Sequence, residues 1–172
     1  NALAWVMLLF TAFNGVSRTL EEDRPAVLAY LKTVVNPVHY FVARTLHNSA
    51  VLAGLACLLT ALMGLLMGWG TLEGPRLWGF LAGMALTALA LGATLTLIAL
   101  IAARAGAGFG MTAVLGLPLM LPVVLVSTSL GSDLMQGVLV ADTWHNFAFL
   151  GALAAGSGTL GVVLFPYLWR AQ

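Results

Sequence analysis

The sequence predicts an all-α membrane protein, a polytopic helix bundle that forms one domain over residues 1–172 and contains five membrane spans. Of its 172 residues, 61% are hydrophobic and only 8% are charged, and the mean hydropathy is +1.01. A soluble domain carries about 25% charged residues because its surface must face water. The apolar residues also form long runs, and a helical span needs roughly 20 of them to cross a hydrocarbon core about 30 Å thick. Barrel strands would be shorter and alternating, so the runs indicate helices.

The predicted spans follow the chain in order, at about residues 2–18, 49–69, 77–103, 111–130 and 146–169. The apolar run of the first span, Ala2 to Val16, is interrupted only by Thr11, Asn14 and Gly15. The third would be about 40 Å long at 1.5 Å per residue, so it must tilt or protrude. The fourth contains Pro118 and Pro122, which should kink it, either as a static bend or as a bent wall around a cavity.

The basic residues predict an orientation. If the link between the first two spans is cytoplasmic, six basic residues fall inside and Arg76 alone falls outside, a strong positive-inside bias. The inner six are Arg18, Arg24, Lys32, Arg44, Arg104 and Arg170. The outer links carry Glu73, Asp133 and Asp142 instead. This orientation places the C-terminus in the cytoplasm. Because the chain starts without methionine, at a run somewhat short for a span, we expect an N-terminally trimmed unit of six helices.

The stretch "RTLEEDRPAVLAYLK", residues 18–32, holds six of the thirteen charged side chains. Pro25 suits the first turn of a helix, and the acidic residues before it suit the positive end of the helix dipole. Pro37 should end this helix, which we place at about residues 19–36. One apolar face repeats at helical spacing. Its members are Val27, Tyr30, Leu31, Val34 and Val35.

This amphipathic helix has two possible settings. It could rest among the lipid headgroups, as many short interfacial helices do. Its polar part is mainly acidic, however, with Glu21, Glu22 and Asp23 together, and anionic headgroups would repel that charge. A cytoplasmic protein partner fits the charge better.

Several functional classes find no support in the residues. Apart from Arg18 at the very end of the first, the spans as drawn contain no Asp, Glu, Lys, Arg or His, whereas ion-coupled transporters usually keep such groups near the midplane. Phosphate-binding loops need a lysine that "GAGFGMT" lacks. His39, His47 and His145 show no metal-ligand spacing, and a net charge of +1 excludes a nucleic-acid-binding stripe. Cys57, the only cysteine, should be a small buried hydrophobe. A permease driven by a separate cytoplasmic ATPase would explain both these absences and the acidic helix.

Small residues recur at spacings that favour close helix packing. Where lipid gives no hydrophobic drive, small side chains let two helix backbones approach each other. The spacing alone does not distinguish packing inside the chain from a seam between two copies. Two G-x-x-x-G pairs and one stripe in the last span carry the pattern: Gly64 and Gly68, Gly79 and Gly83, and Gly151, Ala155, Gly158 and Thr159.

Four motifs then carry a family resemblance by their order and spacing. They are "WVMLLFTAFNGVSRTLEED", "NPVHYFVARTLHN", the doubled-proline "LPLMLPVVLV" and the terminal "LFPYLWR". Together they resemble the haem exporter B (CcmB) family, the ABC-type permease subunits of bacterial cytochrome c maturation. The similarity covers essentially the whole chain and starts from the second helix of that family.

The resemblance implies a six-helix half-transporter of the ABC-2 permease type in the bacterial cytoplasmic (inner) membrane. It implies a cytoplasmic ATPase partner that binds ATP, a second copy of the permease, and a haem-handling membrane subunit. The chain itself would catalyse nothing and would hold no resident cofactor, with haem as a possible cargo. It would couple ATP hydrolysis to haem export or to release of a haem-loaded chaperone. Alternatives are a permease for a lipid or glycan, or a non-transporting assembly subunit.

In such permeases, the cytoplasmic segment between the second and third helices is a coupling helix that fits a groove on the ATPase. Residues 19–36 would play this part here. Glu21 and Glu22 match the acidic position of the family and Arg44 its basic one, whereas Pro25 stands where a glycine is common and should stiffen the entry. Leu28 and Leu31 would anchor the helix. Glu21, Glu22, Asp23, Arg24 and Lys32 would set its register.

One outer residue is a weak candidate for haem. His145 in "ADTWHNF" could ligate iron, with Trp144 stacked on the porphyrin. A Trp–His pair at the membrane interface is the commoner explanation of such a sequence.

Overall fold

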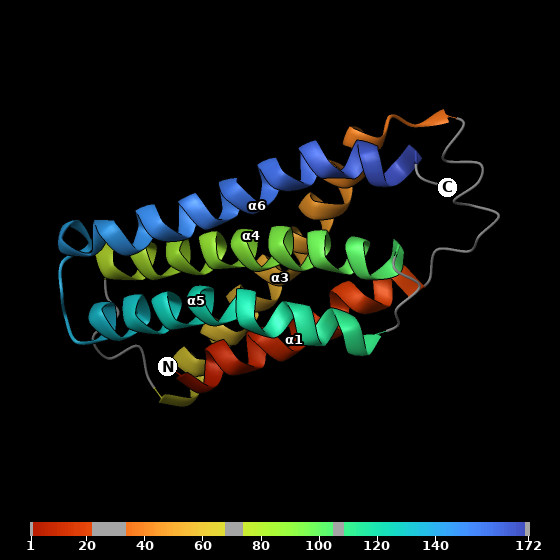
Figure 1. Cartoon of the computed structure of the whole chain (residues 1–172). Helices are drawn as coiled ribbons and strands as arrows, with labels where there is room; N and C mark the ends of the chain where they lie inside the picture. Colours follow the sequence, from red (N-terminus) through yellow and green to blue (C-terminus); the bar gives the residue numbers. More distant parts are fainter. Residues whose placement is uncertain (1, 22–33, 68–73, 105–108, 171–172) are drawn as a thin grey trace.

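The computed structural model describes residues 2–21, 34–67, 74–104 and 109–170, which form α-helices and one short 3-10 helix (Figure 1). The elements are α1 (Ala2–Glu21), α3 (Pro37–Met67), α4 (Pro75–Arg104), α5 (Phe109–Met135), η1 (Val140–Thr143) and α6 (Trp144–Arg170). These described ranges contain no strand. The prediction of an all-α fold is confirmed.

Four of the helices are long and apolar enough to cross a membrane. Their apolar spans are Pro37–Leu66, Arg76–Ala102, Val114–Met135 and Val140–Tyr167. The described apolar stretch of α1, Trp5–Gly15, is shorter, although the 20 residues of this helix extend over about 30 Å. The chain is therefore a multi-pass membrane protein, and each of the five predicted spans corresponds to one helix.

Consecutive helices run in alternate directions, so α1 ends and α3 begins at the same end of the bundle (Figure 1). We call this the basic end, because the helix positions Arg18, Arg44, Arg104 and Arg170 lie toward it. Arg76, in the first turn of α4, lies at the opposite end. The predicted orientation requires consecutive helices to run in alternate directions, and the described helices do so. Arg24 and Lys32 lie outside the described residues.

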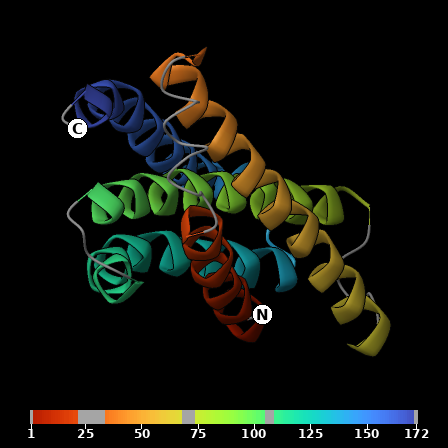
Figure 2. The same ribbon diagram turned by 90° about the vertical axis from the view of Figure 1, so that its right-hand side faces the viewer.

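The centre of the bundle is α4, which packs against α1, α3, α5 and α6. Figure 2 shows α3 crossing α4 obliquely. Every residue from 90 to 100 is buried, with Leu91 and Leu95 no more than 1% exposed. A helix that is apolar all round is buried on all sides, and α4 meets this description because its neighbours enclose it.

Hydroxyl and amide groups join the helices inside this apolar core. The hydroxyls of Thr87 on α4 and Ser127 on α5 share a hydrogen bond of 2.8 Å. Asn48 on α3 donates its Nδ2 to Oγ1 of Thr96 on α4 at 2.9 Å. Ser157 bonds the backbone of its own helix. These serines therefore serve helix packing and the helix backbone.

The start of α3 differs from the prediction. The helix begins at Pro37, not near residue 49, because Asn36 caps it: the Asn36 Oδ1 accepts the backbone N–H of Val38 at 3.0 Å. Proline is favoured at the first helical position, where its missing N–H is not needed. Pro37 is thus the first residue of α3. As a consequence, His39, Arg44 and His47 lie within α3 and not in a link.

The end of α5 also differs, because the helix continues to Met135 and not to residue 130. It closes at Gly137, which has a φ of +90°. The backbone N–H of Gly137 donates to Leu134 O at 3.3 Å and that of Val138 donates to Asp133 O at 3.0 Å, the pattern of a Schellman cap. The polar connection predicted from residue 131 is therefore partly helical. The bounds of α4 and α6 lie within two residues of the predicted spans.

Some of the predicted packing glycines lie inside the bundle. A Cβ atom built on Gly79 would lie 2.6 Å from Cγ2 of Val140, and one on Gly83 would lie 2.7 Å from Cδ2 of Leu130. This pair on α4 therefore accommodates side chains of the same chain. Gly64 is buried on α3, and Gly68 lies outside the described residues.

The stripe on α6 is different, because it faces away from the rest of the chain. A Cβ on Gly151 or Gly158 would meet nothing within 4 Å, and Ala155 is exposed.

The structure also places the two prolines of the predicted fourth span and the single cysteine. Pro118 and Pro122 lie inside an uninterrupted α5. Cys57 is exposed on α3, so the prediction that it is buried is wrong.

Candidate functional site

Two of the predicted coupling residues, Glu21 and Arg44, belong to described helices at the basic end. Glu21 is the last residue of α1, so the predicted segment of residues 19–36 begins within that helix and not after it. Arg44 lies near the start of α3. Glu22, Asp23, Arg24, Leu28, Leu31 and Lys32 lie outside the described residues. The segment therefore joins two helix ends that lie at the same end of the bundle (Figure 1).

An aromatic cluster connects the first turns of α3 to the end of α6. It consists of Tyr40, Phe41 and Phe165. The Tyr40 and Phe165 rings are stacked, with centroids 5.9 Å apart and an interplanar angle of 13°. The Phe41 and Phe165 centroids are 5.8 Å apart. Such pairs contribute about 0.5–1.5 kcal/mol each beyond the burial of their area, so the cluster fixes α3 to α6 at the basic end.

The close fit of this cluster depends on Gly161. The Phe41 ring occupies the space that a side chain at Gly161 would fill. Phe41 and Phe165 are each 1% exposed, and Leu97 and Leu100 of α4 complete the surrounding core. Three helices, α3, α4 and α6, are therefore held together at this point.

Arg44 lies on α3 one turn beyond Tyr40. Its guanidinium carbon is 5.9 Å from the centroid of the Tyr40 ring, a distance at which a cation is attracted to the negative face of an aromatic ring. The side chain is half-buried. Arg44, the basic residue of the predicted coupling site, thus contacts the aromatic cluster from within α3.

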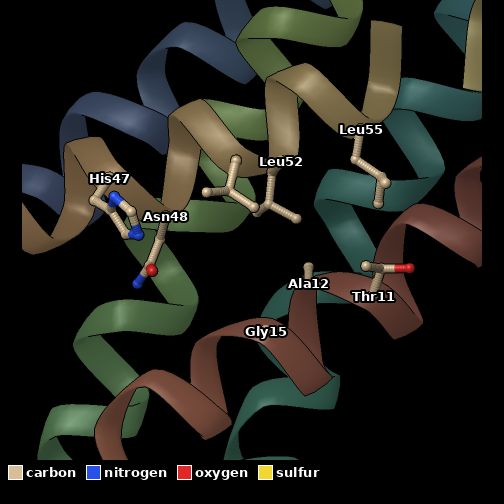
Figure 3. Close-up of a pocket in the computed structure, with 8 residues that line it drawn as sticks. Thr11, Ala12, Gly15, His47, Asn48, Leu52 and Leu55 are labelled. Atoms are coloured by element: carbon tan, nitrogen blue, oxygen red, sulfur yellow. The ribbon is translucent and has the colours of Figure 1, made fainter. Parts of the chain in front are cut away.

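A second feature is a groove between the middle parts of α1 and α3, with a volume of about 220 Å³ (Figure 3). From α1 come Thr11, Ala12 and Gly15. From α3 come His47, Asn48, Val51, Leu52 and Leu55. The two polar side chains of α3 lie toward one end of the groove and its leucines extend away from them. The groove was not among the sites predicted from the sequence.

The weak haem candidate lies at the opposite end. His145 is exposed in the first turn of α6, and its ring lies edge-on to that of Trp144 at 6.4 Å. Trp144 is 68% exposed. Tryptophan is enriched at the membrane interface because it is apolar with one polar edge. This exposed setting fits the interfacial explanation of the pair.

Fold and site together define a polytopic α-helical membrane protein with a charged segment between two helices at its basic end. Comparison of the chain with protein-family models, with curated proteins and with solved structures gives no match.

Proposed function

We propose that this chain is the transmembrane subunit of an ABC transporter complex in cytochrome c maturation. It resides in the bacterial inner membrane, with its basic end and C-terminus in the cytoplasm. It couples ATP hydrolysis in a separate cytoplasmic subunit to haem export, or to release of a haem-loaded chaperone from a neighbouring haem-handling subunit. The family resemblance of the four ordered motifs supports this proposal.

The observation that carries the proposal is the position of the charged segment between α1 and α3. Both helices reach the basic end, so a push on the segment would act on two spans directly. The Phe41 ring, seated against Gly161, then links α3 to α6. Displacement of packed elements as rigid bodies is a known way to transmit such motion.

Within the segment, the side chains divide into two groups. Leu28 and Leu31 anchor it on the ATPase through the hydrophobic effect. Glu21, Glu22, Asp23, Arg24 and Lys32 set its register on the ATPase, since charges contribute more to specificity than to raw affinity. Arg44 stabilises the first turns of α3 through its contact with the Tyr40 ring.

The alternative role, a non-transporting assembly subunit, is supported by the tightly packed core of the described bundle. The middle of α4 is enclosed by its neighbours, and a large apolar cluster fills the space around it. A path for a polar cargo would therefore pass between chains. The outward face of α6, with Gly151, Ala155 and Gly158, would suit close approach of a second copy.

The charge-reversal variant Glu21→Lys/Glu22→Lys tests the proposal. We expect the variant to insert normally but to retain about one tenth of the ATPase or less on co-purification, a loss of binding free energy of at least about 1.4 kcal/mol. The reason is that two attractive contacts become repulsive. The measurement is the ratio of ATPase to permease after affinity purification of the complete complex, together with ATP-dependent cytochrome c maturation.

Asp142→Lys is the matched control. Asp142 is exposed in η1 at the opposite end of the bundle, so the same kind of charge change there should leave the ratio unaltered. Wild-type co-purification and wild-type maturation in the Glu21→Lys/Glu22→Lys variant would refute the proposal.

A further inference from the structure

We propose that α5 is a hinged helix that bends between Pro118 and Pro122. Its first half, residues 109–117, moves with α1, whereas its second half, residues 123–135, stays with α4. The proposal follows from the backbone hydrogen bonds, the packing and the anchoring contacts of this helix. The bending is a property of the chain alone, and only its use in the response to an ATPase rests on the proposed function.

The backbone of α5 lacks two hydrogen bonds that are one turn apart. Pro118 and Pro122 lie inside the helix, and a proline has no backbone N–H to donate. The helical bonds to the carbonyl groups of Val114 and Pro118 are therefore missing. A helix in lipid depends on its own backbone bonds because no water replaces them, and helices bend where proline removes them. The turn between the prolines is thus the weakest part of α5.

The packing around this turn is also loose. Of residues 117–122, all of which the structure describes, Met120 is the only buried one, and Leu117, Leu119 and Leu121 are each at least 50% exposed. Methionine is unbranched and flexible, so its side chain can repack when the backbone changes direction. A static bend would need close packing around it to hold one angle, and these exposed leucines do not supply such packing within the described chain.

The second half of α5 is anchored to α4. The hydroxyls of Ser127 and Thr87 share a hydrogen bond of 2.8 Å, and both residues are 0% exposed. Further along, Leu130 lies against Gly83, where a Cβ atom would be 2.7 Å from Cδ2 of the leucine. A buried hydrogen bond and a close side-chain contact therefore keep this half in place on α4.

The first half is anchored to α1, which lies beside α5 (Figure 1). A Cβ atom built on Gly116 would be 2.8 Å from Cε1 and 2.9 Å from Cζ of Phe13, so the Phe13 ring rests on the α5 backbone. The contact of Gly116 with α4 is looser, because the same Cβ would be 3.6 Å from Cδ2 of Leu95, an ordinary van der Waals distance. A shift of α1 therefore acts on α5 at Gly116, two residues before Pro118.

The weak turn thus lies between two anchors on different helices. When α1 moves relative to α4, α5 must either lose one of its anchors or bend between them. Bending is the easier response, because residues 118–122 already lack two backbone bonds and pack loosely. A push on the charged segment would reach α1 first and would then bend the first half of α5.

The experiment measures distances between pairs of spin labels by pulsed electron paramagnetic resonance. It uses the full chain in lipid nanodiscs, with Cys57→Ala as the background and with no ATPase present. The hinge pair joins Trp78 on α4 to Val114, and the reference pair joins Trp78 to Leu125; all three sites are at least 65% exposed. The distance distribution should be about twofold wider for the hinge pair, because only that pair spans the weak turn. An α1 pair, Phe10 with Val114, should be as narrow as the reference pair.

Proline variants make the assignment specific. Pro118→Ala/Pro122→Ala restores both backbone donors and should narrow the hinge pair to the width of the reference pair. Pro166→Ala is the matched control, because Pro166 also lies inside a helix, α6, and it should leave all three widths unchanged. Phe13→Ala removes the ring that rests on Gly116 and should widen the α1 pair.

Three outcomes would overturn the proposal. Equal widths for the hinge pair and the reference pair in the chain without proline substitutions would make α5 a rigid helix. An unchanged hinge pair in a folded Pro118→Ala/Pro122→Ala variant would place the motion elsewhere. An α1 pair as wide as the hinge pair would separate the first half of α5 from α1.

The first comparison needs no proline variant, so it decides the question even if such a variant fails to fold. Because no ATPase is present, a rigid α5 would leave the proposed coupling to an ATPase standing. In turn, normal co-purification of the ATPase with the Glu21→Lys/Glu22→Lys variant would refute the coupling and leave the hinge standing.

Discussion

Replacing Phe41 by alanine will destabilise the bundle by about 3–5 kcal/mol, the usual cost of removing a buried phenyl ring from a core. Phe41 is 1% exposed and is held between Phe165 and Gly161. Because the ring connects α3 to α6, its loss leaves a cavity and separates the two helices at the basic end. The apparent melting temperature of the purified complex in detergent measures the loss of stability.

The same variant has a second expected effect, on function. The charged segment itself is unchanged, so the ATPase should still co-purify, while ATP-dependent maturation should fall because motion of α3 no longer reaches α6. Phe10→Ala is the matched control, since Phe10 is 64% exposed on α1. Phe41→Leu, which keeps most of the volume, serves if the alanine variant fails to fold. Equal melting and equal maturation in the Phe41 and Phe10 variants would contradict this role.

Replacing Gly92 by valine will separate α3 from α4. A Cβ atom at Gly92 would lie 3.1 Å from both the Cα and the backbone N of Ser49 and would also meet its hydroxyl. A backbone cannot rotate away as a flexible side chain can, so α3 must move as a whole. Overpacking of this kind costs about 1–3 kcal/mol, occasionally more. Thermal unfolding followed by size-exclusion chromatography should show the loss, and Gly92→Ala should show a smaller one.

Gly151→Ala is the control for this series. A Cβ atom there meets nothing within 4 Å, and alanine favours a helix over glycine by up to about 1 kcal/mol. The control should therefore melt at or slightly above the wild-type temperature. Melting temperatures of the Gly92 variants equal to that of the control would contradict the close crossing of α3 and α4.

The helices and their order could be predicted because the membrane imposes strong rules on sequence. A span needs an apolar run of sufficient length, and its backbone must satisfy its own hydrogen bonds. The uniformly apolar run of α4 is the clearest case, and its bounds lie within two residues of the prediction.

Helix ends were harder to predict, for a physical reason. Hydropathy marks where polar side chains begin, whereas a helix continues until its backbone is capped. Asn36 and Pro37 begin α3 twelve residues before the predicted span of residues 49–69. Gly137 ends α5 five residues beyond the predicted limit at residue 130. In both cases a local capping signal was present in the sequence, and it applied to a helix that extends beyond the apolar run.

The aromatic cluster and the groove could not be predicted, because both depend on which helices are neighbours. Phe41 and Gly161 are far apart in the chain, and neither residue indicates the other. The motifs "NPVHYFVARTLHN" and "LFPYLWR" contained the three aromatic residues, but only the packing of α3 against α6 brings them together. The same holds for Gly15 and His47, which line one groove from two different helices.

The most direct test of the account is to ask what the segment between α1 and α3 touches. A photo-cross-linking amino acid is introduced in place of Leu28, within the predicted coupling helix, and separately in place of Asp142 at the opposite end. The complete complex is irradiated in membranes with and without ATP. Our account predicts a cross-link from position 28 to a cytoplasmic ATPase, with a yield that changes with ATP, and none to that subunit from position 142. A cross-link from position 28 to lipid alone, unaffected by ATP, would contradict it.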